Sequence, residues 1–364
     1  MKAILREFRE NRILWLLVVV PVLFVLEHGA ESGSTALFVL SVVAIVPLAS
    51  LLSRATESVA AKTGDAIGGL LNATLGNLTE LVIALTALRA GMMELVKASI
   101  AGAIVTNSLF MLGMALLLGG LRHREQEYNR ANARLQSGML FMAAVAMLVP
   151  SFIGASSKPN AAQLVQDLSI GLAVLLLVAY VLGLVFSLGT HKAIFSGAEH
   201  HDDAEAVWPL NVAVVLLGVV TVLVALVSEI FVESVQQAAL TFGMSPAFVG
   251  FVVVALVGAA AEMATAFAAA RKNRVDLSVG IALGSSAQVA LFVAPVLVLA
   301  SLWIAPTPLD LGFWPGAVIA VLVSTLGVAL VANSGRSAWY IGVQLLVLYI
   351  TFAMALYLLP PAVD

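Results

Sequence analysis

The sequence predicts an all-α integral membrane protein with about 11 transmembrane helices. Hydrophobic residues make up 61% of the 364 positions and charged residues only 11%, against roughly 45–50% and 25% in soluble domains. Long apolar segments follow one another with short polar connections, and a motif containing a glutamate occurs twice. We therefore predict one N-terminal helix followed by two inverted five-helix repeats. The predicted parts are the N-terminal transmembrane helix (1–30), the first repeat (31–190), an acidic cytoplasmic linker (191–207) and the second repeat (208–364).

Each predicted helix is an apolar segment long enough to cross most of a ~30 Å hydrocarbon core at ~1.5 Å per residue. The first segment follows a basic N-terminus, as in a signal peptide. However, Glu27 and His28 stand where a small-residue cleavage site is expected, so we predict that the segment stays as a helix. No strand pattern bounded by hairpin turns is present. In chain order the segments are 13–26, 36–53, 66–88, 94–120, 137–154, 165–188, 208–231, 246–270, 275–303, 313–332 and 338–359.

The distribution of Lys and Arg predicts how these helices are oriented. With a cytoplasmic N-terminus, 15 of the 18 basic residues fall in cytoplasmic segments, and only Arg89, Lys97 and Lys158 fall outside. Positive charges are enriched on the cytoplasmic side of membrane proteins. We therefore predict a cytoplasmic N-terminus and an extracytoplasmic C-terminus. The short chain without a long basic extension favours a bacterial inner membrane.

A carboxylate lies in the middle of the third apolar segment, within Gly76-Asn77-Leu78-Thr79-Glu80. Glu80 is nine residues from Arg89, the charge that closes the segment. On a helix this separation is roughly 14 Å, about half of a ~30 Å hydrocarbon core. An unpaired carboxylate at that depth costs at least ~2.5–3.5 kcal/mol, so a functional role is expected.

The same motif recurs 182 residues later. Residues 76–113 and 258–295 are identical at nine of 38 positions, which include the pairs Gly76/Gly258, Glu80/Glu262 and Arg89/Arg271. Chance similarity explains shared Leu and Ala but not shared Glu, Arg and Gly in register. The predicted orientation makes the two copies inverted, so both carboxylates lie at the same depth and together form a cation site. Gly76 and Gly258 are the predicted helix kinks.

Polar residues also follow each glutamate in the next apolar segment. Asn107 follows the first glutamate, and Ser285 and Gln288 follow the second. One interpretation is packing of small residues with interhelical hydrogen bonds, which is common in membranes. The other is a set of oxygen ligands, because Glu, Asn, Gln, Ser and backbone carbonyls suit a hard cation such as Ca²⁺. The presence of a midplane glutamate in each copy favours ligands.

Other ionisable residues have two interpretations each. Glu57 and Glu229 lie near the ends of apolar spans, either as hydrated helix-end carboxylates or as a proton path to the site. A charged segment of the linker is either a solvated loop or a regulatory element that binds Ca²⁺ or senses pH. The residues of this segment are His200, His201, Asp202, Asp203 and Glu205.

The motifs resemble those of a known family. The segments Gly68–Glu80, Lys97–Gly102 and Gly284–Gln288 are similar to the repeat motifs of cation/proton exchangers, the proton-coupled branch of the calcium/cation antiporter superfamily. The resemblance spans nearly the whole chain and includes Thr190-His191-Lys192 and the acidic segment. It implies that Ca²⁺ is exchanged for protons. The residues implied to bind or surround the calcium are Glu80, Glu262, Asn77, Asn107, Ser285 and Gln288.

The second motif departs from the family pattern. Where the family usually has Gly-Asn-Ala-Ala-Glu-His, this chain has Ala259 in place of Asn and Met263 in place of His. One side of the site therefore lacks an amide and a titratable ring. This departure bears on affinity and ion choice more than on fold or on exchange.

The predicted function is secondary antiport of Ca²⁺ against protons by alternating access. A sodium- or potassium-proton antiporter on the same fold is the alternative, and a cation channel fits two opposed carboxylates less well. An enzyme is not expected, because the chain has no Cys and none of its five His lies within a predicted membrane interior. No cofactor is expected, and the net charge of −3 gives no reason to expect nucleic acid. The expected partners are Ca²⁺, H⁺ and the lipid bilayer; the oligomeric state stays open, a homo-oligomer included.

Overall fold

The computed structural model describes residues 12–29, 34–63, 65–154, 160–191 and 208–361, and these are almost entirely helical, as predicted. The elements of the first half are η1 (Arg12–Val18), α2 (Val19–Gly29), α3 (Thr35–Lys62), α4 (Asp65–Leu75), α5 (Leu78–Arg89), α6 (Met93–Val105), η2 (Thr106–Met111), α7 (Leu112–His123), β1 (Glu125–Glu127), α8 (Arg130–Gly154), α9 (Ala161–Leu184) and η3 (Val185–Thr190). Those of the second half are α11 (Leu210–Phe242), α12 (Pro246–Phe248), η4 (Val249–Val254), α13 (Ala255–Gly258), α14 (Ala260–Arg271), α15 (Val275–Gln288), η5 (Val289–Val293), α16 (Ala294–Ile304), α17 (Pro315–Ala332), β2 (Arg336–Ala338) and α18 (Trp339–Leu358).

The number of membrane-spanning helices is close to the prediction. Within the described residues, eight helical stretches are long and apolar enough to cross a membrane, and ten if each of two bent helix pairs is one span. The segment predicted as the first span forms a shorter apolar helix, Ile13–Gly29. The predicted eleven thus correspond to these ten spans and this shorter helix.

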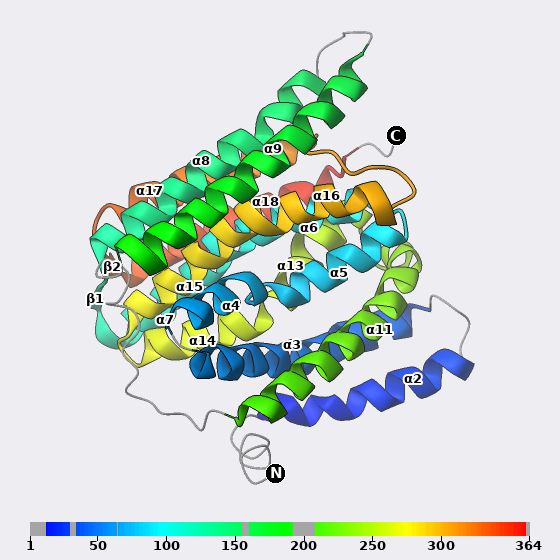
Figure 1. The fold of residues 1–364 in the computed structure, drawn as a ribbon, viewed down its shortest axis with the longest axis horizontal. Coiled ribbons are helices and arrows are strands. Elements are labelled where there is room, and N and C mark those ends of the chain that lie inside the picture. Colours follow the sequence, from blue (N-terminus) through cyan, green and yellow to red (C-terminus); the bar gives the residue numbers. More distant parts are fainter. Residues whose placement is uncertain (1–11, 30–33, 64, 155–159, 192–207, 362–364) are drawn as a thin grey trace.

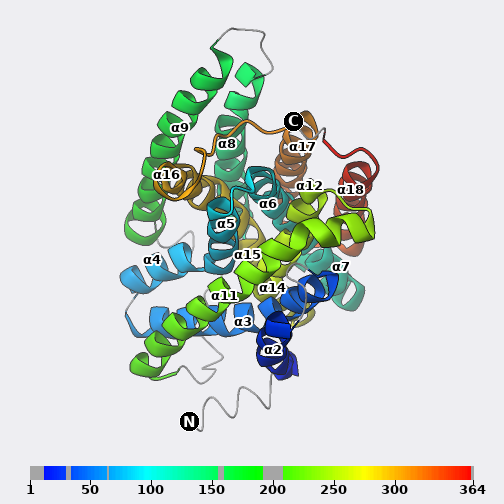
Figure 2. The ribbon, with the colours of Figure 1, turned by 90° about the vertical axis from the view of Figure 1, so that its right-hand side faces the viewer.

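Two broken helices lie inside the helical bundle. The long helices α3 and α11 pack along each other with α2 beside α3, at the bottom of Figure 1, whereas α8, α9 and α17 lie on the opposite side. Between these groups run the bent pairs α4–α5 and α13–α14, together with α6 and α15; Figure 2 shows the same order from the side. The segments that carry the two glutamates therefore lie inside the bundle.

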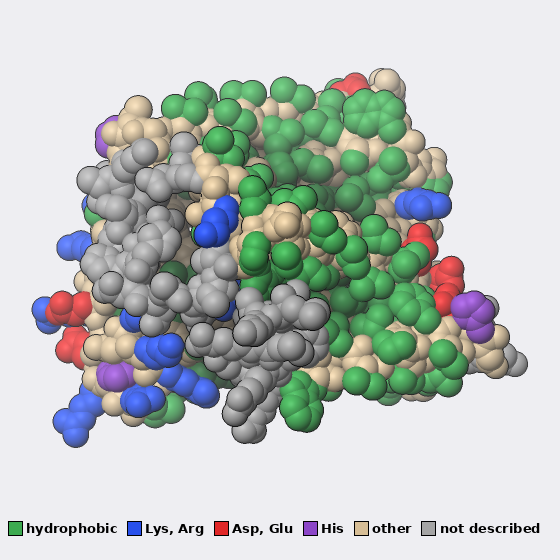
Figure 3. Space-filling view, turned by 60° about the horizontal axis from the view of Figure 1, so that its bottom comes forward, with side chains coloured by type: hydrophobic (Ala, Val, Ile, Leu, Met, Phe, Trp, Pro, Cys, Tyr) green, Lys and Arg blue, Asp and Glu red, His purple; other side chains and the backbone are tan. Residues whose placement is uncertain are grey.

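The outer surface fits a lipid environment. On the face shown in Figure 3, hydrophobic side chains fill the middle and charged ones gather at the two ends. Large apolar side chains of the outer helices are exposed, for example Leu182 of α9 and Val215 of α11, each 63% exposed. Exposed apolar surface of this extent is stable in a bilayer and not in water. The chain is an integral membrane protein.

The structure contains one short two-stranded ribbon, which is not a hairpin. β1 and β2 pair antiparallel, with Gln126 opposite Ser337. An ion pair of 2.8 Å between Arg336 and Glu127 accompanies this pairing. Each strand has only three residues, and its partner lies in the other half of the chain, so no hairpin signal exists in the sequence. The ribbon ties the α7–α8 connection to the α17–α18 connection.

Candidate ion-binding site

Both glutamates stand directly after a helix break. The α4–α5 pair bends by 44° around Gly76 and Asn77, and the pair around Ala259 bends by 58°. Gly76 thus lies in its break, whereas Gly258 is the last residue before the second one. The breaks place Glu80 in the first turn of α5 and Glu262 in the first turn of α14. Negative charge is favoured at a helix N-terminus, because the first N–H groups have no partner within the helix.

Each glutamate lies against the glycine of the other copy. A Cβ atom at Gly258 would be 2.8 Å from Cγ and 3.2 Å from Oε1 of Glu80. A Cβ atom at Gly76 would be 3.8 Å from Oε1 of Glu262 and 3.4 Å from Oε1 of Gln288. The two motifs, distant in sequence, therefore meet at their breaks. A side chain at Gly258 would displace that of Glu80, whereas one at Gly76 would first collide with the Asn72 carbonyl oxygen, at 2.8 Å.

Four of the predicted site residues form one hydrogen-bonded chain. Asn77 Nδ2 donates to Gln288 Oε1 at 2.7 Å, and Ser285 Oγ donates to Asn77 Oδ1 at 2.8 Å. Asn107 Nδ2 then donates to Ser285 Oγ at 2.9 Å. Both ends of the Asn77 amide are thus in use. Asn77 orients Ser285 and Gln288 across the helix crossing.

Three oxygens at this crossing have no hydrogen-bond partner among the described residues. They are Glu80 Oε1, Glu262 Oε2 and Asn107 Oδ1, and all three atoms are buried. Buried polar atoms are nearly always paired, because an unpaired one keeps its full desolvation penalty. Carboxylate and amide oxygens are the ligands that hard cations prefer. These atoms therefore fit a bound cation, or, at the carboxylates, a proton.

This hydrogen-bonded chain has no counterpart at the positions related to it by the repeat. In the second copy, the residue that matches Asn77 is Ala259. In the first copy, the residue that matches Ser285 is Ala103, and both alanines are buried. Thr106, which matches Gln288, instead donates to the hydroxyl of Tyr349 at 3.4 Å. The departure from the family pattern at Ala259 is therefore part of a wider loss of polar partners on that side.

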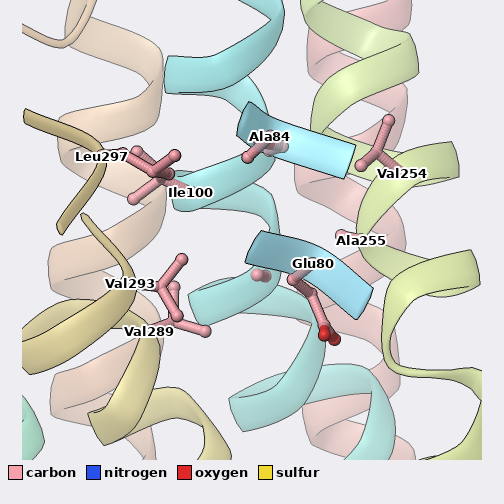
Figure 4. Close-up of a pocket in the computed structure, with 10 residues that line it drawn as sticks. Glu80, Ala84, Ile100, Val254, Ala255, Val289, Val293 and Leu297 are labelled. Atoms are coloured by element: carbon pink, nitrogen blue, oxygen red, sulfur yellow. The ribbon is translucent and has the colours of Figure 1, made fainter. Parts of the chain in front are cut away.

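The site is closed by apolar side chains toward Arg89. A small pocket next to Glu80 is lined by Ala84, Ser99, Ile100, Leu297 and further apolar residues. Figure 4 shows the Glu80 carboxylate directed away from Ile100 and Leu297. Ala84 lies one turn beyond Glu80 on the way to Arg89, so the pocket lies on that side of the carboxylate.

On the other side the residues of the site are more exposed. Glu80 is only 7% exposed, whereas Glu262, Gly284 and Gln288 are half-buried. Gly284 is one turn nearer than Gln288 to Arg271, the charged end of α14. The site is therefore more accessible from the Arg271 end of the molecule than from the Arg89 end.

The predicted proton-path residues lie outside the hydrogen-bonded chain. Glu57 of α3 accepts from Ser53 Oγ at 3.2 Å and pairs with Arg54 at 3.6 Å. Glu229 of α11 pairs with Arg89 at 3.6 Å, and both side chains are at least half exposed. Their role in proton transfer stays a prediction. The acidic segment with His200 and His201 lies outside the described residues.

Sequence reasoning did not identify Gln136 of α8 as a candidate. Its Oε1 atom is buried without a hydrogen-bond partner among the described residues. This atom would be 4.0 Å from a Cβ atom at Gly284. The signal in the sequence is the spacing of Asn129, Asn132 and Gln136, three amides on one face of a helix.

Comparison with known proteins agrees with this geometry. The sodium/calcium exchanger protein family matches residues 33–189 and 212–358. A Ca(2+)/H(+) antiporter of Aphanothece halophytica is 38% identical, with 95% of this chain and 96% of that protein covered. The Ca(2+)/H(+) antiporter ChaA of Bacillus subtilis (strain 168) is also 38% identical, with 96% and 100% covered.

Solved structures share the fold. The structure of native YfkE superposes with a TM-score of 0.82 at 35% identity and covers 95% of this chain and 100% of that one. An H+/Ca2+ exchanger, CAX, has a TM-score of 0.72 at 17% identity, with 97% of this chain and 88% of that one covered. The resemblance predicted from the two glutamate motifs is confirmed: the chain belongs to the sodium/calcium exchanger protein family.

Proposed function

We propose that the protein is a secondary antiporter that exchanges Ca²⁺ for protons by alternating access. The observation that carries this proposal is the meeting of Glu80 and Glu262 at two helix breaks, each with a buried oxygen that has no partner among the described residues. The names of the relatives, which are Ca(2+)/H(+) antiporters, support transport of these two ions and not catalysis.

The coupling follows from competition for the same oxygens. When Ca²⁺ is bound, Glu80 and Glu262 are both ionised and their charges are balanced by the ion. Without a cation, two like charges in an apolar interior repel each other, and protons replace the ion. A site that holds either Ca²⁺ or protons, but not both, exchanges one for the other as it faces the two sides in turn.

The remaining site residues shape this exchange. Asn107 supplies as a ligand its Oδ1 atom, which has no hydrogen-bond partner among the described residues, and Ser285 and Gln288 are held toward the ion by Asn77. Gly76 and Gly258 leave room for the carboxylate of the opposite copy. Glu57 and Glu229 pass protons between the site and solution from the two flanking helices, and the acidic segment regulates transport.

The orientation of the protein completes the proposal. With the N-terminus in the cytoplasm of a bacterial inner membrane, the accessible Arg271 end of the site faces the cytoplasm. The protein would then take up cytoplasmic Ca²⁺ in this state and release it outside after the helices rearrange.

Uptake of radioactive calcium into everted membrane vesicles tests the proposal. An imposed pH gradient should drive uptake, and collapse of the gradient should stop it. Sodium and potassium serve as competitors. If Na⁺ or K⁺ moves against protons and Ca²⁺ does not, the alternative antiporter holds; current that flows without a pH gradient would indicate a channel.

A further inference from the structure

A line of polar groups runs along α8 toward the site. At its start, Asn129 N donates to Asp276 Oδ1 at 2.9 Å, which joins the beginnings of α8 and α15. Asn132 N donates to Asn129 Oδ1 at 3.1 Å, and Gln136 Nε2 donates to Asn132 Oδ1 at 2.9 Å. Asn132 is only 4% exposed. In a bundle with so few polar groups, this line leads from the Arg271 end of the molecule inward.

The line ends on an oxygen with no hydrogen-bond partner in the described chain. Gln136 uses its NH₂ group within α8, so the carbonyl oxygen of the amide is fixed and points toward α15. That oxygen is buried and is the nearest atom to a Cβ position at Gly284, at 4.0 Å. An amide that only holds two helices together would be paired across the interface, because burial of an unpaired oxygen is costly.

One turn before Gly284, α15 borders open space. Among the described residues, nothing lies within 4 Å of a Cβ position at Gly280. The corresponding region of α6 is filled: a Cβ atom at Gly102 would collide with the backbone of Phe251, and one at Gly250 would be 2.7 Å from the Leu95 carbonyl oxygen. Gly102 of α6 and Gly250 of η4 therefore serve close packing, whereas Gly280 borders free space and Gly284 has room for a Cβ atom.

This free space leads to the ion site. Gln288 lies one turn after Gly284 on the same face of α15, and its Oε1 accepts from Asn77. Like Gly284, Gln288 and Glu262 are half-buried. A cation that passes Gln136 would thus next meet oxygens of the site.

We propose that Gln136 is an entry ligand: its Oε1 atom binds the cation briefly on its way between the Arg271 end and the glutamates. The expected ligand is a hard cation, Ca²⁺ in particular, which exchanges a water oxygen for an amide oxygen at this point. This inference rests on the proposed calcium/proton exchange.

The test separates the rate of entry from affinity for the main site. Gln136→Leu keeps a similar volume and removes the oxygen. In proteoliposomes, the initial rate of calcium uptake at low Ca²⁺ should fall about 10-fold, the size expected for loss of a contact to a charged group. Equilibrium calcium binding by the solubilised protein should stay unchanged, because Glu80, Glu262 and Asn107 are intact.

The matched control is Gln166→Leu. Gln166 is a half-buried glutamine of α9 whose Nε2 donates to Leu309 O at 3.4 Å, away from the site. This variant should transport as the wild type does. A Gln136→Leu protein with the wild-type rate, or with affinity and rate reduced together, would overturn the entry role. Lack of exchange by the wild type would instead overturn the proposed function.

A second measurement does not depend on the leucine variant being folded. The chain has no native Cys, and a Cβ atom fits at Gly284, so Gly284→Cys can report on the passage. A cationic, membrane-impermeant thiol reagent should modify this cysteine from the Arg271 side and block transport, and Ca²⁺ should slow the reaction. Gly171→Cys, on the exposed face of α9, should not react in the membrane. An unreactive Gly284→Cys would show that no passage exists.

Discussion

At the level of single residues, the two glutamates differ from every other carboxylate described. Glu80 and Glu262 each combine a helix N-terminus, a glycine of the other copy and a buried oxygen that lacks a hydrogen-bond partner within the described residues. Glu57 and Glu229 are instead partly exposed and have hydrogen-bond or ion-pair partners. The exchange chemistry therefore depends on the first pair.

We expect Glu80→Gln and Glu262→Gln each to abolish exchange while the protein stays folded and inserted in the membrane. Gln has nearly the same shape, but its amide cannot take up and release a proton and offers one oxygen in place of two. The measurement is proton-driven calcium uptake in vesicles, with Glu94→Gln as a control on an exposed carboxylate. Substantial calcium uptake by either site variant would contradict the shared-site mechanism.

Asn77→Ala should weaken the apparent calcium affinity. The substitution leaves Ser285 and Gln288 without the amide that orients them. A hydrogen bond between neutral groups contributes ~0.5–1.5 kcal/mol, so loss of these two should cost ~1–3 kcal/mol, or roughly 5- to 150-fold in affinity. The calcium dependence of proton release at fixed pH measures the change.

The reverse substitution supplies the comparison. Ala259→Asn restores the family pattern in the second copy and should tighten calcium binding or narrow selectivity toward it, provided that the buried position of Ala259 accepts the larger side chain. If Asn77→Ala leaves the calcium affinity unchanged, then the glutamates and backbone oxygens suffice to bind the ion. The difference between Asn77 and Ala259 would then have no effect on function.

At the level of elements, the two broken helices are not in equivalent positions. In the second half, α12, η4 and α13 pack on α6, with Gly250 against Ala98 and Phe251 against Gly102. The matching segment α4 packs instead on α3 and η3, and a Cβ atom at Gly68 would collide with the Ala60 carbonyl. This difference leaves one end of the site open and the other closed.

Alternating access predicts that α4 packs on α15 in the opposite state. In this structure Gly250 packs against Ala98. The shift of 182 residues matches Gly68 to Gly250 and Ala98 to Gly280, so Gly68 should contact Gly280 in the opposite state. The double variant Gly68→Cys/Gly280→Cys should form a disulfide only when that state is populated, because a disulfide requires Cα atoms within ~7 Å. The bond should stop transport, and its reduction should restore transport; each single variant is the control. A pair that never cross-links during turnover would rule out this closure.

At the level of the whole molecule, polar contacts hold both ends of the bundle. The β1–β2 ribbon joins the two halves at one end. Near the start of α6, Lys97 Nζ donates to Asp310 Oδ1 at 2.8 Å and to Gly312 O at 3.0 Å, which fixes α6 to the α16–α17 connection. Because these two contacts lie at opposite ends, each side of the membrane has its own link between the halves.

Cysteine labelling in intact cells tests the orientation. Glu94 and Lys272 are exposed residues in the two glutamate-bearing halves, and the distribution of basic residues predicts that Glu94 faces outward and Lys272 inward. Glu94→Cys should react with an impermeant reagent added outside, and Lys272→Cys only after the membrane is opened. Labelling of both from the same side would disprove the inverted arrangement.

The sequence by itself determined the membrane class, nearly all of the spans and the position of the two carboxylates within their spans. These properties depend on local features: the length of apolar segments and the distance from Glu80 and Glu262 to the arginine that follows each. Tertiary structure alone decided which groups meet. Asn77 bonds to residues 208 and 211 positions away, the buried Oε1 of Gln136 faces Gly284, and β1 pairs with a strand of the other half. In a membrane protein both core and lipid-facing surfaces are apolar, so hydrophobicity specifies that a helix spans the bilayer but not which face packs against which neighbour. That choice depends on the close fit of glycines and side chains at the helix crossings, which exists only once the two halves are packed together.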